Sequence, residues 1–166
     1  MQPVGKQPRP FDALRASGLA RAQGDYTGLI AAAYDQIEGR RSDDVDLLTK
    51  LFDPARSPLS IIDLGAGSGR VTIPLASLGH QMTAVDLSAE MLDQLQSKAK
   101  AQNVDIAAEV GSMTSVSSAD RSFDGCLITY NSFYNLTDRS QRQACLGEAF
   151  RILKPGGLFF LDVELP

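Results

Sequence analysis

Apolar residues along this chain recur with two different periods, and the two periods predict two kinds of element. In residues 19–37 and 45–52 they fall three or four positions apart, the spacing of a helix that buries one face. After residue 60, apolar runs of strand length alternate with further segments of helical spacing. The strand-length runs are residues 61–64, 81–87, 104–110, 123–129 and 158–163, and the helical segments are residues 71–78, 88–99 and 138–153. Strands that alternate with helices predict an α/β fold with a doubly wound parallel sheet.

The ends of two of these helices carry recognisable capping residues. Ser88 precedes one helix and has Glu90 in the first turn, while Asp138 precedes another and has Gln141 three residues later. The run 154–157, Lys-Pro-Gly-Gly, is expected to stop the second helix before the last strand. The residues expected on the inner face of this helix are Cys145, Leu146, Ala149, Phe150 and Leu153.

The glycine-rich stretch 63–70 is the strongest local signal in the chain. Three glycines at every second position, Gly65, Gly67 and Gly69, follow a buried strand and precede a helix with Pro74 in its first turn. A strand, a glycine turn and a helix N-terminus allow the backbone to approach a ligand closely. The stretch therefore predicts a site for a nucleotide-type cofactor, and a tight turn with incidental glycines is the alternative.

The spacing of the glycines discriminates between cofactors. A dinucleotide fingerprint requires G-x-G-x-x-G, but here the third glycine comes one residue early and Arg70 stands in its place. A nicotinamide oxidoreductase is therefore disfavoured. Asp86 follows Gly67 by 19 residues, close to the offset of about 20 at which an acid meets the cofactor ribose. A solvent-facing acid at the end of a strand is the alternative for Asp86.

Composition narrows the function further. The 166 residues fit one domain, the net charge is −4, and no basic face for a phosphate backbone is apparent, so nucleic acid is not expected as a partner. Cys126 and Cys145 lack metal-type spacing and are expected to be buried thiols. The single histidine, His80, is expected to act as a cation near a helix C-terminus. No metal site and no catalytic triad is predicted.

The chain is expected to be cytoplasmic and not to bind a membrane. No apolar run approaches the roughly 18 residues of a membrane span, and the N-terminus lacks the apolar core of a signal peptide.

Three segments together resemble the class I S-adenosylmethionine-dependent methyltransferases. Residues 63–69 look like the family's first glycine motif, residues 79–88 look like its second strand with the ribose acid, and residues 153–157 look like the turn before its fifth strand. The resemblance implies a Rossmann-like core at 59–166, preceded by an N-terminal helical lid at 11–58 and a flexible tail at 1–10.

This resemblance implies S-adenosyl-L-methionine as the cofactor and S-adenosyl-L-homocysteine as its product. It would place Gly65 and Gly67 against the methionine part, Asp63 near its amino group, Asp86 on the ribose and Met113 beside the adenine. Many relatives have an acid where this chain has Ser112, and a hydroxyl accepts hydrogen bonds more weakly. The full set of expected cofactor residues is Tyr26, Asp63, Gly65, Ala66, Gly67, Gly69, Asp86, Leu87, Ser112 and Met113.

For the acceptor, residues 130–136 and the upstream segment around Tyr34 resemble bacterial small-molecule methyltransferases. The N-P-P-Y motif of enzymes that methylate base amines is absent. We expect Tyr130 and Asn131 to position a small-molecule acceptor, and Tyr34 to approach the site from the lid. Methyl transfer to nitrogen or oxygen requires mainly positioning and the exclusion of water.

The family's sheet has further strands after the fifth, and this sequence ends at Pro166. An apolar edge at 158–161 would then be left open to pairing. A fragment, a homodimer and a partner chain that covers the edge of strand five are the alternatives. The competing function is a non-catalytic S-adenosylmethionine-binding or scaffold protein.

Overall fold

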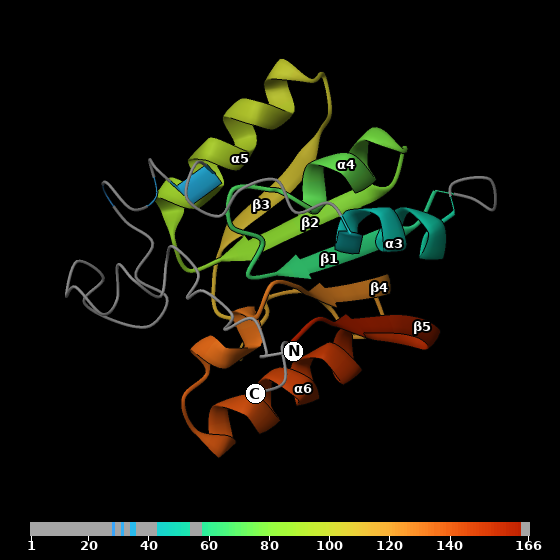
Figure 1. Ribbon diagram of the computed structural model, residues 1–166. Helices are drawn as coiled ribbons and strands as arrows, with labels where there is room; N and C mark the ends of the chain where they lie inside the picture. Colours follow the sequence, from blue (N-terminus) through green and yellow to red (C-terminus); the bar gives the residue numbers. More distant parts are fainter. Residues whose placement is uncertain (1–27, 29–30, 32–33, 36–42, 54–57, 164–166) are drawn as a thin grey trace, which may run out of the picture.

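The computed structural model describes residues 28, 31, 34–35, 43–53 and 58–163. The predicted tail at 1–10, Tyr26 and most of the predicted helix at 19–37 lie outside these residues. Figure 1 shows the elements, which are α3 (Asp43–Leu51), β1 (Ser60–Leu64), α4 (Thr72–Ser77), β2 (Gln81–Asp86), α5 (Ala89–Ala101), β3 (Ile106–Val110), β4 (Phe123–Ile128), the 3-10 helix η1 (Ser132–Asn135), α6 (Arg139–Ile152) and β5 (Leu153–Leu161).

The five strands form one sheet in the order β3-β2-β1-β4-β5, and every neighbouring pair is parallel. The chain first builds outward from β1 to β3 and then returns to the other side of β1 with β4. This reversal between β1 and β4 is the topological switch point at which doubly wound sheets bind ligands. The predicted fold class is confirmed.

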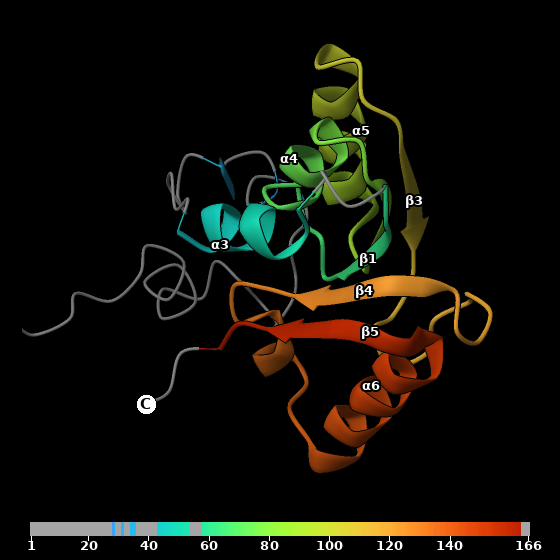
Figure 2. The same cartoon turned by 90° about the vertical axis from the view of Figure 1, so that its right-hand side faces the viewer.

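Helices cover both faces of the sheet. Figures 1 and 2 show α3, α4 and α5 in one layer and α6 in the other. Side chains of β1 alternate between the two layers, since Ile61 belongs to the core cluster under α4 and α5, whereas Ile62 and Leu64 belong to the cluster under α6. This double coverage explains why residues 61–64 are buried without interruption.

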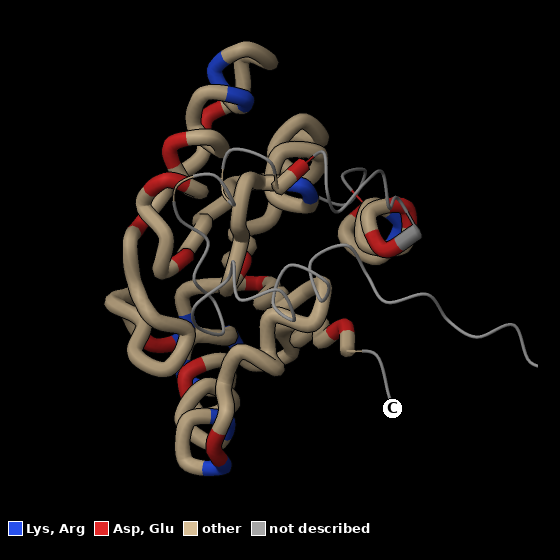
Figure 3. The backbone as a smooth tube through the Cα atoms, turned by 60° about the vertical axis from the view of Figure 1, so that its left-hand side comes forward, with Lys and Arg blue, Asp and Glu red and all other residues tan. Residues whose placement is uncertain are grey.

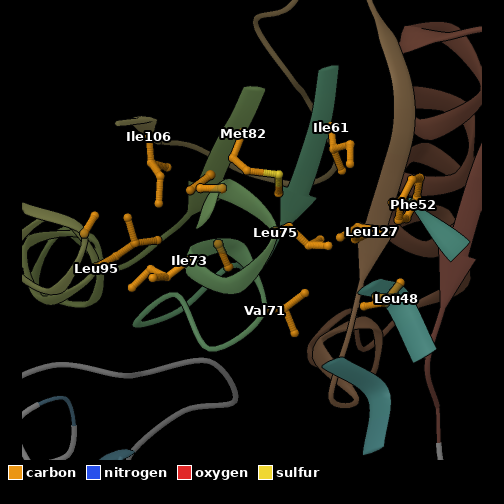
Figure 4. Packing of buried hydrophobic residues seen from close by; sticks show 14 of the residues in the cluster. Leu48, Phe52, Ile61, Val71, Ile73, Leu75, Met82, Leu95, Ile106 and Leu127 are labelled. Carbon is orange, nitrogen blue, oxygen red and sulfur yellow. The ribbon is translucent and has the colours of Figure 1, made fainter. Parts of the chain in front are cut away.

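The core under α4 and α5 is the larger of the two clusters. Figure 4 shows part of it, with Ile61 and Met82 from the strands meeting Ile73, Leu75 and Leu95 from the helices. It holds α4 and α5 against the strands whose ends carry the glycine turn and Asp86.

Helix α5 begins as the sequence predicts. Ser88 has an extended conformation, and its hydroxyl accepts a hydrogen bond from the Met91 N–H at 3.2 Å. Glu90 lies in the first turn. The predicted inner residues are all buried, and they are Met91, Leu92, Leu95 and Ala99.

Helix α6 corrects the prediction for its inner face. Cys145, Ala149 and Ile152 are buried, but Leu146 is 42% exposed and Phe150 is 86% exposed. The buried positions form a narrow stripe at spacings of four and three, and Phe150 lies about 100° around the helix from Ala149. The apolar residue types therefore suggested a wider buried face than the helix has.

Strand β5 begins earlier than the sequence predicts. The run 154–157 does not separate a helix from a strand, because β5 already starts at Leu153, directly after α6. The pairing with β4 shifts within this run, from Phe123 opposite Leu153 to Gly125 opposite Leu158. The proline and glycines therefore produce an irregularity within the strand.

His80 also departs from its prediction. It is 4% exposed, and its Nδ1 accepts a hydrogen bond from the Leu59 N–H at 3.2 Å. Its Nε2 lies 2.7 Å from the Phe52 carbonyl oxygen and therefore donates the second bond. His80 therefore joins the residue after α3 to the residue before β1, from inside the core and not from an exposed helix end.

Charges are intermixed on the described part of the chain, and Figure 3 shows basic and acidic positions on the same helices. Both cysteines are free and buried, as expected. Among the described residues, no helix is long and apolar enough to cross a bilayer, and no cluster of metal-ligating side chains occurs.

Candidate active site

The glycine turn after β1 forms one end of a cavity. Gly65 and Gly67 have φ of +81° and +55°, values that L side chains rarely adopt. The N–H groups of Gly65 and Ala66 both donate to the Val85 carbonyl, at 2.8 and 3.1 Å, which ties the turn to the end of β2. A Cβ at Gly65 would lie 2.9 Å from the Cβ of Ser132, so any side chain at this lining position would collide with η1.

The third glycine has a different task. A Cβ at Gly69 would lie 2.8 Å from Leu95 and 2.9 Å from Ile73. Gly69 therefore allows the start of α4 to pack closely against α5, and it does not line the cavity.

Asp86 lies at the carboxyl end of β2 and faces the turn. Its Oδ2 accepts from the Gly67 N–H at 2.8 Å, and its Oδ1 accepts from the Ser88 N–H at 2.9 Å. Burial raises the pKa of Asp86, and these backbone hydrogen bonds oppose that rise. Each carboxylate oxygen can accept a further bond, so a pair of ribose hydroxyls can be bound here.

Asp63 lies beneath the turn and does not line the cavity. It is 1% exposed, and the Thr72 hydroxyl donates to its Oδ2 at 2.7 Å. Its Oδ1 has no hydrogen-bond partner among the described residues. Burial raises the pKa of Asp63 to about 6, against the opposing effects of the Thr72 hydrogen bond and the Arg70 charge.

The cavity has a volume of about 410 Å³, within the range of ligand sites. The glycine turn, Asp86 and Met91 line one side. The loop 111–114 after β3, Tyr34 and six residues between 130 and 141 complete the lining. Leu87 stands at the rim with 66% of its surface exposed, as an apolar residue that a bound planar ring would cover.

Most of the residues expected from the sequence come together at this cavity. The predicted residues that line it are Tyr34, Gly65, Gly67, Asp86, Leu87, Ser112, Met113 and Tyr130. Ala66, Gly69, Asp63 and Asn131 are not among the lining residues, and Tyr26 lies outside the described part of the chain.

Ser112 is engaged within its own loop. Its hydroxyl accepts from the Thr114 N–H at 3.1 Å and lies 2.8 Å from the Thr114 hydroxyl. A carboxylate at this position could reach farther into the cavity and accept more strongly. A purine bound at this loop would therefore depend more on apolar contacts with Leu87 and Met113.

The wall of the cavity that begins directly after β4 lies against the glycine turn, since the Ser132 Oγ is 3.4 Å from the Gly65 carbonyl oxygen. Tyr130 and Asn131 both have left-handed backbone conformations, with φ of +54° and +62°. Such values are uncommon for asparagine and are outliers for a bulky residue such as tyrosine. The chain thus turns sharply at the carboxyl end of β4 and directs the segment 132–137 back over the cavity.

Several lining residues were missed from the sequence. They are Met91, Gly111, Thr114, Ser132, Asn135, Leu136, Thr137 and Gln141. Their position in the chain is the feature that could have identified them, since most of them follow the carboxyl end of β3 or β4. Gln141 was assigned only to capping, and its side chain does accept from the Thr137 N–H at 3.1 Å.

The residues present fit S-adenosylmethionine. Bare backbone at Gly65 and Gly67 leaves space for an amino-acid tail, and Asp86 can accept hydrogen bonds from a ribose. Leu87, Met91 and Met113 offer apolar contacts for a purine. Among the described lining residues only Asp86 carries a full charge, so they offer no cationic side chain for a pyrophosphate.

Comparison with known proteins agrees with this geometry. A family model described as a methyltransferase domain matches residues 61–157, more than half of the chain. The chain is 31% identical to a cypemycin N-terminal methyltransferase of a Streptomyces species, over 85% of this chain and 57% of that relative. It is 30% identical to the ubiquinone/menaquinone biosynthesis C-methyltransferase UbiE of Nitrobacter hamburgensis, over 73% of this chain and 51% of that relative.

A solved structure shares the fold as well. The CcbJ methyltransferase from Streptomyces caelestis superimposes with a TM-score of 0.72 at 28% identity, over 84% of this chain and 57% of that one. The chain spans about half the length of the curated relatives it matches. Because the family model covers the glycine turn, Asp86 and the end of β4 together, this chain belongs to the class I S-adenosylmethionine-dependent methyltransferase family.

Proposed function

We propose that this protein transfers a methyl group from S-adenosylmethionine to nitrogen or oxygen of a small-molecule acceptor. The observation that carries the proposal is one cavity lined by two kinds of group. Gly65, Gly67 and Asp86 offer bare backbone and a carboxylate, and Tyr34 and Tyr130 add two aromatic side chains to the same lining. A donor held on the first group would have its reactive end near the second.

The residues of the cavity act mainly by positioning. S-adenosylmethionine, when bound, supplies an electrophilic methyl group on a sulfonium. The turn at Gly65 and Gly67 fixes the amino-acid tail, and Asp86 fixes the ribose. Tyr34 and Tyr130 orient the acceptor in line with the methyl group and exclude water, which supplies much of the acceleration in such displacements.

The acceptor must also lose a proton. The hydroxyls of Tyr34 and Tyr130 are hydrogen-bonding groups on the acceptor side of the cavity. An amine needs little more than such a group or a water molecule to take its proton. The name of the Streptomyces relative, an N-terminal methyltransferase, makes nitrogen the first acceptor atom to test.

Calorimetric titration tests the cofactor. The protein should bind S-adenosylmethionine and S-adenosylhomocysteine and should not bind NAD. Asp86→Ala should weaken the binding of S-adenosylmethionine and of S-adenosylhomocysteine by about tenfold or more, because two hydrogen bonds to ribose hydroxyls are lost. Binding of NAD with no binding of S-adenosylmethionine would overturn the assignment.

A metabolite screen with a labelled methyl donor tests the transfer. Label should enter an amine or hydroxyl compound only in the presence of the protein. Binding of the cofactor with no transfer to any compound would favour the alternative, a non-catalytic cofactor-binding or scaffold protein.

A further inference from the structure

Arg70 directly follows the glycine turn, and the proposed function gives it no task. Its Nη1 and Nη2 donate to the two carboxylate oxygens of Asp44 on α3, at 2.7 and 2.6 Å. The two side chains are only 22% and 15% exposed. Burial works to lower the pKa of Arg70, but the hydrogen bonds and charge of Asp44 outweigh burial and raise it, so the pair is firmly ionised.

The same guanidinium contacts the acceptor wall. Its central carbon lies 5.1 Å from the centroid of the Tyr130 ring, within cation-π distance. A bidentate pair with a carboxylate fixes the plane of the guanidinium as well as its position. Asp44 therefore holds Arg70 in one orientation, and Arg70 supports one face of the Tyr130 ring.

The backbone of Tyr130 is held separately from its ring. Its left-handed conformation is strained for a bulky residue and persists only where the surroundings enforce it. Asp162, just past β5, holds this conformation with two hydrogen bonds. Its Oδ2 accepts from the Tyr130 N–H and its carbonyl oxygen accepts from the Asn131 N–H, both at 3.2 Å. The Asp162 N–H donates to the Ile128 carbonyl at 2.9 Å, which anchors this clamp to β4.

We propose that Arg70 and Asp162 are positioning residues that fix Tyr130 at the acceptor wall of the cavity, Arg70 through the ring and Asp162 through the backbone. The acceptor role of Tyr130 rests on the proposed function, whereas its fixation is a property of the protein alone. The arrangement joins three separate parts of the chain, the glycine turn, the end of β4 and the end of β5, at one aromatic ring.

The fixation can be measured without any acceptor. The protein is labelled with 3-fluorotyrosine, and fluorine NMR resolves the resonances of its four tyrosines, with the one from Tyr130 assigned by Tyr130→Phe. Arg70→Lys keeps the charge but loses the bidentate pair, and Asp44→Asn weakens that pair from the other side. Both should shift or broaden the Tyr130 resonance while the Tyr134 resonance stays in place.

Asp162 is tested by a pair of variants. Asp162→Ala should disturb the Tyr130 resonance, whereas Asp162→Asn keeps an accepting oxygen and should restore it. Lys154→Met, which breaks the ion pair of Lys154 with Asp124, is the matched control and should leave the resonance unchanged. A Tyr130 resonance that is unaltered in both Arg70→Lys and Asp162→Ala overturns the proposal.

The functional consequence is tested in the same variants with the acceptor found in the labelled-methyl screen. Arg70→Lys should raise the KM for that acceptor by about tenfold. Its Kd for S-adenosylhomocysteine should stay within about twofold of the original protein, because Arg70 does not line the cavity. An equal rise in the KM for the acceptor and the Kd for S-adenosylhomocysteine would contradict a positioning role. If the original protein transfers no methyl group, the proposed function fails, and the NMR result still decides the fixation of Tyr130.

Discussion

Two acids at the ends of neighbouring strands show how much a carboxylate depends on its surroundings. Asp86 receives two backbone N–H groups and faces the cavity, whereas Asp63 receives the Thr72 hydroxyl and is enclosed. Burial raises the pKa of Asp63 to about 6 from its ordinary value of 3.8. A rise of about two pKa units corresponds to about 3 kcal/mol between the two protonation states.

Asp63 should therefore give the protein a characteristic pH dependence. Between pH 3.8 and about 6 the folded state binds a proton that the unfolded state releases, so the free energy of unfolding falls as the pH rises through this window. In Asp63→Asn this contribution disappears. Urea unfolding of the cofactor-free protein at several pH values should show the difference between the two proteins changing by about 1.4 kcal/mol per pH unit inside the window.

Burial also raises the pKa of Asp86, but this contribution is present in both proteins and cancels in the difference between them. Two further carboxylates near the site act outside the window. The pKa values of Asp35 and Asp44 are lowered from 3.8, because hydrogen bonds and ion pairs with Lys98 and Arg70 outweigh the opposing effect of burial. Their contribution is therefore lost only below the window of Asp63. A difference between Asp63→Asn and the original protein that is constant from pH 4 to pH 7 would contradict the assignment.

We expect Gly65 to be required for cofactor binding. A side chain there would strain the backbone and would also crowd neighbouring side chains, and a second variant separates these two effects. Gly65→Ala introduces a strained φ and a Cβ that lies 3.3 Å from Met113 as well as close to Ser132. Gly79→Ala introduces the same kind of strain, at φ +94°, into open space. Both should lose about 1 kcal/mol or more of stability. Only Gly65→Ala should also weaken the binding of S-adenosylhomocysteine, by about tenfold or more in calorimetry. Equal affinities of the two variants for this ligand would argue against the turn as the cofactor site.

For individual residues, the sequence predicts which ones meet at the cavity better than it predicts which ones pack two helices together. The spacing from Gly67 to Asp86 correctly predicts that the two lie together, because the ends of adjacent parallel strands share one edge. Gly69 belongs to the same motif but packs α4 against α5, a contact between two helices that no local pattern contains. The engagement of Ser112 with Thr114 is likewise a matter of loop conformation.

Among the elements, α6 shows where periodicity reaches its limit. Its N-terminal cap was predicted correctly, since Asp138 accepts from the Gln141 N–H at 2.9 Å. Its buried face was predicted too wide, because the pattern of apolar residues does not say how much of the helix surface the sheet covers. The neighbouring run 154–157 was misplaced for a related reason, since Pro and Gly can interrupt a strand pairing as well as end a helix.

The corrected face of α6 gives a test. Phe150→Gln should change the free energy of unfolding by less than about 0.5 kcal/mol, since the ring is 86% exposed. Ile152→Ala on the buried stripe should cost about 2 to 5 kcal/mol. Thermal or urea unfolding distinguishes them, and a large loss in Phe150→Gln would restore the wider buried face.

At the scale of the whole molecule, the alternation of strands and helices correctly predicts the doubly wound sheet. The order of its strands depends on how the connecting segments cross the sheet. The reversal between β1 and β4 was not itself visible as a motif. It follows from the segment 111–122, which joins β3 to β4 without a helix and carries the chain across to the other side of β1. This crossing brings Tyr130 close to the glycine turn, where Arg70 lies 5.1 Å from the centroid of its ring.

The edge of the sheet carries a prediction about assembly. Among the described strands, none pairs with the outer side of β5, and Leu158 on it is 39% exposed. We expect a second copy to pair there, since exposed apolar edge strands are templates for association. Light scattering should report a dimer at micromolar concentration, and Leu158→Lys should raise its dissociation constant by about tenfold or more. A monomer at that concentration would rule this pairing out.

Division of the cavity between two stretches of sequence has an evolutionary consequence. Lining residues come from 65–91 and 111–114 in the first stretch and from 130–141 in the second. On the proposed function, mutations between β4 and α6 would alter which compound is methylated while the binding of the donor is inherited unchanged. Exchange of this short segment between relatives would then be a direct way to build hybrid enzymes with new acceptors.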